Sequence, residues 1–142
     1  MRLSVYSDLS LRALMYLAGL EGGGLASTAR IAERFGVSMF HLQKAIQGLR
    51  RLGYVTSLPG RNGGLRLARP AASIRVGALL GELEETGALV DCARGPCPLC
   101  GACSLARALD QAERAFYAAL DQFTLADLLT GRTHAVVRRL IA

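Results

Sequence analysis

Residues 27–52 read STARIAERFGVSMFHLQKAIQGLRRL, and this stretch predicts two short helices joined by a tight turn. Ser27 and Ser38 can each cap a helix, because a serine hydroxyl accepts a hydrogen bond from the free N–H groups of a first turn. Gly36 lies between the two helices and suits a left-handed turn, which other residues adopt less easily. The second predicted helix, residues 39–52, has an apolar face at helical spacing, formed by Leu42, Ala45, Ile46 and Leu49.

The opposite face of this second helix is polar and basic near its start. It carries Ser38, Phe40, His41, Gln43 and Lys44. In a helix-turn-helix protein, the first turns of the second helix enter the major groove of DNA. A helical hairpin buried in a core would show the same apolar spacing. The exposed polar start of the helix favours the DNA-reading interpretation.

A strand, a glycine-rich turn and a second strand are predicted directly afterwards, over residues 54–67. Leu65 and Leu67 alternate with Arg66, which is the period of a half-buried strand. The turn holds Arg61 and Asn62 among glycines, so its backbone could approach a phosphate closely, and an arginine there suits a narrow minor groove. A hairpin that follows a recognition helix is typical of the wing of a winged helix. A plain surface hairpin is the alternative.

Four further helices and a loose tail at residues 131–142 are predicted around this unit. The helices cover residues 7–20 with Ser7 as the cap, residues 76–85 with Ser73 as the cap, residues 104–120, and residues 125–129 with Thr124 as the cap. The first of them is apolar on most sides, so we expect it to be buried on most sides and to meet a partner chain. The predicted fold class is mainly α with a small β-hairpin.

The helix predicted over residues 104–120 carries a long apolar seam, formed by Leu105, Leu109, Ala112, Phe116 and Leu120. Such a seam can pack on its own domain, but its length favours pairing with a second copy in a homodimer. The chain then divides into three parts. These are a winged helix-turn-helix DNA-binding domain at residues 1–75, a cysteine loop with a dimerisation helix at residues 76–130, and a C-terminal tail at residues 131–142.

The net charge of +6 is unevenly distributed: residues 1–75 carry +8 and residues 76–142 carry −2. A basic N-terminal half indicates a polyanionic partner, with double-stranded DNA the usual one, although a solvated basic surface is the alternative. No apolar run approaches the roughly 18 residues of a membrane span. Asp8 and Arg12 interrupt any apolar segment of a signal peptide. We therefore expect a cytoplasmic protein with no membrane partner.

All four cysteines lie within one loop of twelve residues, at Cys92, Cys97, Cys100 and Cys103. In a reducing cytosol, clustered thiols more often bind metal or act in redox chemistry than form structural disulfides. Iron–sulfur clusters and zinc both use thiolates, and crowding in one loop is closer to ferredoxin-like ligation than to paired zinc knuckles. A reversible disulfide between Cys97 and Cys100 is a third interpretation.

The charges near this loop favour an anionic centre. Arg94 and Arg107 are close to the thiols in sequence, and Cys103 lies at a predicted helix N-terminus, so we expect lowered thiol pKa values. The chain has no nucleophile–base pair, no phosphate-binding glycine loop after a strand and no carboxylate dyad. His41 and His134 are isolated in the sequence. We therefore do not expect an enzyme.

Several segments together resemble the bacterial iron–sulfur winged-helix regulators of the Rrf2 superfamily. They are MRL at residues 1–3, SDLSLR at 7–12, LGYV at 52–55 and GGLRLA at 63–68. The loop from Cys92 to Cys103, RAFYAALD at 114–121 and LADL at 125–128 are most similar to the nitric-oxide-sensing NsrR branch, with IscR and RirA more distant. The resemblance covers the chain except for its tail.

This resemblance implies a dimer of winged helices with crossed long helices, which regulates transcription and usually represses it. It implies a [4Fe–4S] cluster held by Cys92, Cys97 and Cys103, with Asp8 of the partner subunit as fourth ligand. Cys100 departs from the family pattern and could replace Asp8. A [2Fe–2S] cluster or zinc is an alternative cofactor. The implied effector is nitric oxide, and redox or iron status is the other possible signal.

Overall fold

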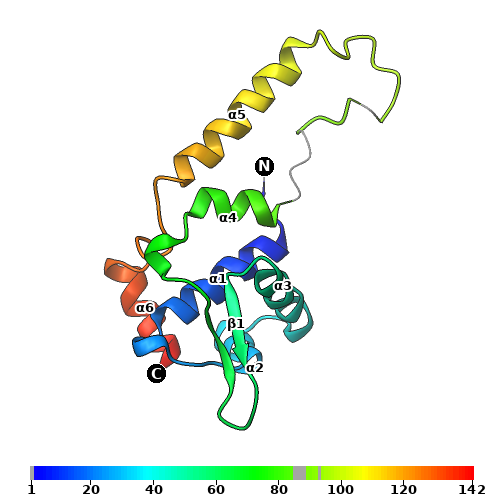
Figure 1. Cartoon of the computed structure of the whole chain (residues 1–142). Helices are drawn as coiled ribbons and strands as arrows, with labels where there is room; N and C mark the ends of the chain where they lie inside the picture. The colour runs from blue at the N-terminus through cyan, green and yellow to red at the C-terminus, as the bar shows by residue number, and fades with distance from the viewer. Residues whose placement is uncertain (1, 85–88, 93) are drawn as a thin grey trace.

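The computed structural model describes residues 2–84, 89–92 and 94–142 (Figure 1). The described residues form a mainly helical fold with one small antiparallel hairpin, which confirms the predicted fold class. The elements in chain order are α1 (Val5–Gly19), η1 (Glu21–Gly23), α2 (Thr28–Phe35), α3 (Met39–Arg51), β1 (Val55–Leu58), β2 (Gly64–Leu67), η2 (Ala71–Ser73), α4 (Val76–Leu83), α5 (Ser104–Leu120) and α6 (Gly131–Ile141).

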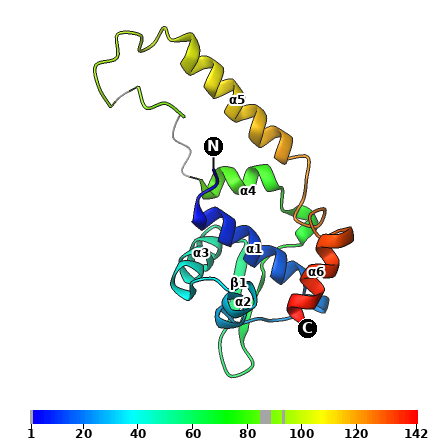
Figure 2. The ribbon, with the colours of Figure 1, turned by 180° about the vertical axis from the view of Figure 1, so that it is seen from behind.

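Helix α1 lies at the centre of the body and packs against α3, α4, α6 and strand β2. Both views show these elements arranged around it (Figures 1 and 2). Its buried apolar side chains are Leu9, Ala13, Leu14, Tyr16 and Leu17. The helix is thus buried on most sides, as its sequence predicts.

The predicted start of this helix was wrong by two residues. Helix α1 begins at Val5, and its cap is Ser4, whose Oγ accepts a hydrogen bond from the Ser7 backbone N–H at 3.1 Å. Ser7 therefore lies inside the first turn. Both serines have the chemistry of a cap, and the sequence alone does not show which of them is followed by the buried face.

Helices α2 and α3 form the predicted helix-turn-helix. The Ser27 Oγ accepts from the Arg30 N–H at 3.1 Å, and the Ser38 Oγ accepts from the His41 N–H at 3.4 Å. Gly36 adopts φ 61°, the left-handed conformation expected at the turn. The inner face of α3 is buried as predicted, at Leu42, Ala45, Ile46 and Leu49.

Strands β1 and β2 pair with Val55 opposite Leu67 and Ser57 opposite Leu65. Leu65 is buried and Arg66 is exposed, as the alternation predicts. The hairpin is also tied to the segment before α2, because Ala26 and Leu65 exchange backbone hydrogen bonds of 3.1 and 2.8 Å. This link fixes the wing relative to the helix-turn-helix.

Helix α5 has the predicted bounds, and it projects from the body with the cysteine loop at its far end (Figures 1 and 2). None of its residues is buried, and Leu105 in its apolar seam is 63% exposed. Its near end is held to α4, since the Ala78 N–H donates to Asp121 Oδ1 at 2.9 Å and Arg75 donates to the Asp121 carbonyl at 2.8 Å. Among the described residues, no helix is long and apolar enough to cross a membrane.

The prediction that residues 131–142 form a loose tail was also wrong, because residues 131–141 form helix α6. Val137 is 4% exposed, and a side chain at Gly19 of α1 would clash with it. The Arg30 guanidinium of α2 donates to the Ile141 carbonyl at 2.7 Å, and Arg138 pairs with Glu21. The sequence signal was weak because α6 has only one fully buried residue.

Two other helix predictions, at residues 125–129 and at residues 76–85, need correction. Residues 125–129 form a turn rather than a helix, closed by Asp127 Oδ2, which accepts from the Thr124 N–H at 2.8 Å and the Thr124 hydroxyl at 2.7 Å. These hydrogen bonds lower the pKa of Asp127. The predicted helix at residues 76–85 is α4, with Arg75 at its cap position and Ser73 in the preceding η2. Residue 85 lies outside the described residues.

Replacing Val137 with alanine should lower the free energy of unfolding by about 1.5 kcal/mol, because the substitution removes two buried carbon groups at ~0.8 kcal/mol each. Val136→Ala is the matched control, since Val136 lies on the same helix and is 42% exposed. Its effect should stay within about 0.5 kcal/mol. Urea unfolding followed by circular dichroism measures both. Equal effects of the two substitutions would contradict the packing of α6 on α1.

Candidate nucleic-acid interface and cysteine loop

The outer face of α3 presents the side chains that the sequence singled out. Phe40 is 62% exposed, and His41, Gln43 and Lys44 are exposed as well. The Lys44 Nζ lies 5.2 Å from the centre of the Phe40 ring, and the His41 ring meets the same ring edge-on at 5.7 Å between centroids. These contacts hold the side chains together at the start of α3, and the positive charge of Lys44 is exposed there. Ser38 contributes as the helix cap rather than as a free hydroxyl.

The wing offers a second exposed basic group. Arg61 and Asn62 at its tip and Arg66 on β2 are all exposed. The tip is tight, because a side chain at Gly63 would lie 2.1 Å from the Leu58 carbonyl oxygen. The hairpin extends from the body beyond α2 (Figure 1). An exposed helix face and a protruding basic hairpin are the two reading elements of a winged helix on DNA.

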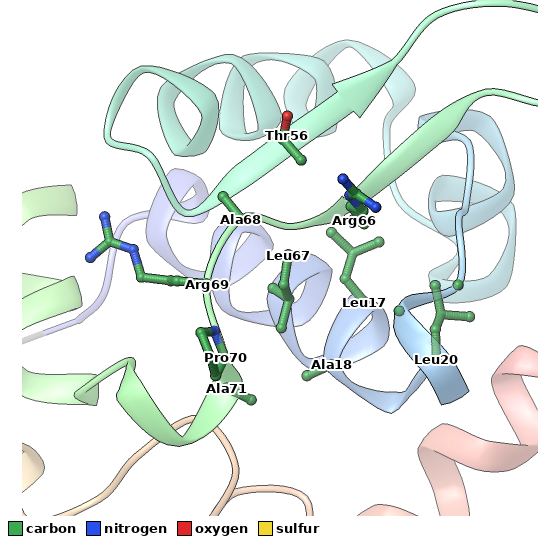
Figure 3. A pocket seen from close by; sticks show the side chains of 12 residues that line it. Leu17, Ala18, Leu20, Thr56, Arg66, Leu67, Ala68, Arg69, Pro70 and Ala71 are labelled. Atoms are coloured by element: carbon green, nitrogen blue, oxygen red, sulfur yellow. The ribbon is translucent and has the colours of Figure 1, made fainter.

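An open cavity of about 510 Å³ lies between the end of α1 and the wing (Figure 3). Its apolar side is formed by Leu17, Leu20 and Leu67, and its charged lining residues are Arg66 and Arg69. Arg69 is engaged within the protein, since it donates to the Gly53 and Leu52 carbonyls at 3.1 and 3.2 Å. This lining carries no acid–base or nucleophilic pair.

The four cysteines are free thiols in the structure. Cys97 and Cys100 are exposed and share one turn, in which the Cys100 N–H donates to the Cys97 carbonyl at 3.1 Å. Cys92 and Cys103 are partly buried, and Cys103 is at the cap position of α5 as predicted. The loop therefore presents two outer thiols and two that are more sheltered.

Partial burial raises the pKa of the Cys92 thiol, and the charges of the thiolates at Cys100, Cys97 and Cys103 raise it further. These thiolates act on Cys92 because charges interact over several ångströms near a surface. The other three cysteines of the loop therefore lie close enough to affect the Cys92 thiol.

The expected lowering of thiol pKa values by nearby arginines is wrong for Cys92. The Arg94 guanidinium lies 3.6 Å from the Asp91 carboxylate, and Arg107 donates to the Ser104 hydroxyl at 3.2 Å. Both arginines are thus directed to other partners. Sequence proximity indicated that they were near the loop but not where their side chains point.

Among the residues that the structure describes, no three His, Cys, Asp or Glu side chains converge into a metal site. The donor chemistry nevertheless fits an iron–sulfur cluster or zinc, because thiolates are the soft ligands that both prefer. Gly101 adopts φ 85° between the last two cysteines, and a side chain at Gly95 would meet no neighbouring atom within 4 Å. The loop thus has room and backbone freedom for its thiols to turn toward one centre.

Asp8 is in the first turn of α1, where its carboxylate is held by Arg12. The Arg12 Nη2 lies 2.8 Å from Asp8 Oδ2, and the Arg12 Nε donates to Asp8 Oδ1 at 3.1 Å. The structure does not bring Asp8 to the cysteines of its own chain, because α1 is in the body and the loop is at the far end of α5 (Figure 1). Sequence reasoning missed Arg12 as the partner of Asp8, although a spacing of four residues on a helix is the signal for such a pair.

Residues 3–131 match the model of the Rrf2 family, which is described as an iron-dependent transcriptional regulator. Among solved structures, CymR of B. subtilis, a global cysteine regulator, is 26% identical, with 90% of this chain and 95% of that chain covered and a TM-score of 0.72. IscR of T. potens is 31% identical, with 91% and 86% covered and a TM-score of 0.72. The oxidised form of Staphylococcus aureus CymR is 27% identical, with 92% and 98% covered and a TM-score of 0.72.

Replacing Lys44 or Arg61 with alanine should weaken binding to duplex DNA and should lower the slope of log affinity against log salt by about one for each lost phosphate contact. Arg61→Ala should weaken binding to AT-rich duplexes more than Lys44→Ala does, because a narrow minor groove concentrates negative potential at the wing. Fluorescence anisotropy titrations at several KCl concentrations measure both effects.

The control for these two variants is Arg132→Ala, which removes the same charge from an exposed position on α6. Its binding should stay close to that of the unmodified protein. If all three variants lost affinity equally, DNA would be held by net charge alone and the assignment of α3 and the wing would fail.

Proposed function

The chain belongs to the Rrf2 family, so it is a transcriptional regulator rather than an enzyme, and we propose that it is a cytoplasmic repressor whose operator affinity is set by an iron–sulfur cluster. One observation carries the proposal. A winged helix with an exposed basic face is joined, through α4, to a loop of four free thiols. The signal at the loop is nitric oxide, or else redox or iron status.

Cys92, Cys97 and Cys103 would hold a [4Fe–4S] cluster, with [2Fe–2S] or zinc as alternative occupants of the same thiols. When bound, the cluster supplies iron that reacts with nitric oxide and exchanges electrons. The pKa of Cys92 is raised, so this thiol would lose its proton on binding, when the positive charge of a metal favours the thiolate. Loading should therefore release protons and depend on pH.

Asp8 of the partner subunit would supply the fourth ligand, with Cys100 of the loop as the alternative. The Asp8 carboxylate is held at both oxygens by Arg12, so at least one of these contacts has to open before the oxygen can bind iron. A carboxylate is a harder ligand than a thiolate and is the one more easily displaced from such a site. Displacement would return Asp8 to Arg12 and loosen the link between subunits.

The apolar seam of α5 supports the homodimer. None of its residues is buried within the chain, yet Leu109, Phe116 and Leu120 recur on one face of the helix. Covering such a face removes apolar area from water, which stabilises the covered state by roughly 25 cal/mol per Å². The same helix of a second copy offers a matching seam, so a symmetric pair covers both faces at once. Two winged helices would then contact two half-sites of an operator.

Protein purified without oxygen should be brown, with cluster absorption near the visible region that bleaches on addition of nitric oxide. Serine substitution of Cys92, Cys97 or Cys103 should abolish the colour, because a serine hydroxyl is a poor ligand for iron. Cys100→Ser should retain it if Asp8 is the fourth ligand, and Asp8→Ala should then destabilise the cluster. A colourless protein that carries one zinc per chain would overturn the cluster assignment.

A thiol or zinc switch at the same loop is the second candidate. It is favoured by the exposed pair Cys97 and Cys100, which share one hydrogen-bonded turn. A disulfide between them requires Cys100, so Cys100→Ser should abolish any change in DNA affinity on mild oxidation. Under the cluster proposal, the same substitution leaves the response to nitric oxide in place. Anisotropy titrations with an operator selected from a randomised duplex library distinguish the two.

A further inference from the structure

The end of α4 contacts the start of α1 through its cap residue, Glu84. Its Oε1 accepts hydrogen bonds from the Ser4 backbone N–H at 2.8 Å and from the Ser4 hydroxyl at 3.1 Å. Burial alone would raise the pKa of Glu84, but the hydrogen bonds from Ser4 and Ser7 hold it below its ordinary value. The carboxylate thus stays ionised at the positive end of the α1 dipole.

The last turn of α4 reaches the base of the wing through Glu82. The Glu82 carboxylate acts electrostatically on the Tyr54 hydroxyl, and Tyr54 is buried where α3 ends and β1 begins. Burial and this carboxylate raise the pKa of Tyr54 to about 12, so the phenol stays protonated. The Tyr54 backbone is held as well, because its N–H donates to Leu49 of α3 and its carbonyl accepts from Ala68, each at 2.9 Å.

Arg69 extends this connection to both reading elements. Its guanidinium lies 4.4 Å from the centre of the Tyr54 ring, and it donates to the carbonyls of Leu52 and Gly53 at the end of α3. Arg69 itself follows β2 by two residues. One side chain therefore connects the exit of the wing, the tyrosine at its entry and the end of the recognition helix.

The two carboxylates also face α3 across a cavity of about 700 Å³. Lys44 and Arg51 of α3 line this cavity together with Glu82 and Glu84. Helix α4 is anchored on the other side by the buried Leu79 and Leu83, so its last turn is held as part of the body. Seven residues separate Glu84 from Cys92, and among the described residues α4 is the helix that precedes the cysteine loop.

We propose that Glu82, Glu84, Tyr54 and Arg69 are positioning residues that couple the cysteine loop to the two DNA-reading elements within one chain. A shift of the α4 end alters the Glu84 contact with the start of α1 and the Glu82 contact with the wing base together, because Glu82 is in the last turn of α4 and Glu84 is its cap residue. Arg69 contacts both Tyr54 and the end of α3, so a displacement of the wing base also moves the end of α3. The proposal rests on the proposed function, since it presumes that the state of the loop controls DNA affinity.

Glu82→Gln and Tyr54→Phe test the wing branch, and Glu84→Gln tests the α1 branch. Tyr54→Phe removes only the hydroxyl and keeps the ring against Arg69. The measurement is the ratio of operator Kd values between the cluster-loaded protein and the same protein after nitric oxide treatment. The operator duplex is one selected with the unmodified protein. That protein should show a ratio of about tenfold or more, within the usual range of allosteric coupling.

Each variant should reduce this ratio to within about twofold while at least one of its two states binds DNA as the unmodified protein does. Glu33→Gln is the matched charge control, because Glu33 is exposed on α2. Tyr16→Phe is the matched hydroxyl control, since the Tyr16 hydroxyl is buried with no hydrogen-bond partner in the described part of the chain. Both controls should keep the full ratio.

Variants that keep the full ratio, or that lose affinity equally in both states, would overturn the proposal. If the unmodified protein shows no ratio, the proposed function fails, and amide hydrogen exchange of the metal-free protein then decides the coupling alone. Glu82→Gln and Tyr54→Phe should speed exchange in β1, β2 and the end of α3, and Glu84→Gln should speed it at the start of α1. Unchanged exchange at these sites would rule out the contacts as couplers.

Discussion

Helix α1 has apolar side chains around most of its circumference, and the requirement to bury them organises the rest of the body. The recognition helix α3 and strand β2 cover part of it, α4 covers another part, and α6 closes the remainder. Because these elements share one packed core, the position of α3 depends on all of them. The buried hydroxyl of Tyr16, which has no partner among the described residues, shows that burial of this helix outweighs a polar penalty of about 1–3 kcal/mol.

Local signals predicted the helix-turn-helix well, because their causes are local. The caps Ser27 and Ser38 and the turn at Gly36 each act within four residues, and the structure confirms them. The C-terminal helix α6 was missed because its stability comes from Val137 against α1, more than a hundred positions away in the chain. The same limit explains the misplaced cap at Ser7, since tertiary packing determines where α1 begins.

The sequence predicted which cysteines form the candidate site but not the side-chain contacts around it. The cysteine spacing alone pointed to a metal or redox loop, but the partners of Arg94, Arg107 and Asp8 depend on side-chain directions. Tyr54, Arg69 and Glu82 gave no signal, because a tyrosine after a helix and an arginine after a strand are ordinary in sequence. Their contacts join segments that meet only in the folded chain.

The remote position of the cysteine loop limits how a signal can reach DNA. The loop is at the far end of α5, away from its own α1 (Figure 2), so the two proposals give a signal two different routes. The proposed function would route it through a second copy that covers α5 and offers Asp8 of the partner subunit, and this route would require an assembled dimer, whose population depends on protein concentration. The proposed coupling would run back along the same chain to Glu84 and Glu82, and it would be independent of concentration. A regulator that uses both routes needs only a small free-energy change on each, because ~1.4 kcal/mol already alters affinity tenfold.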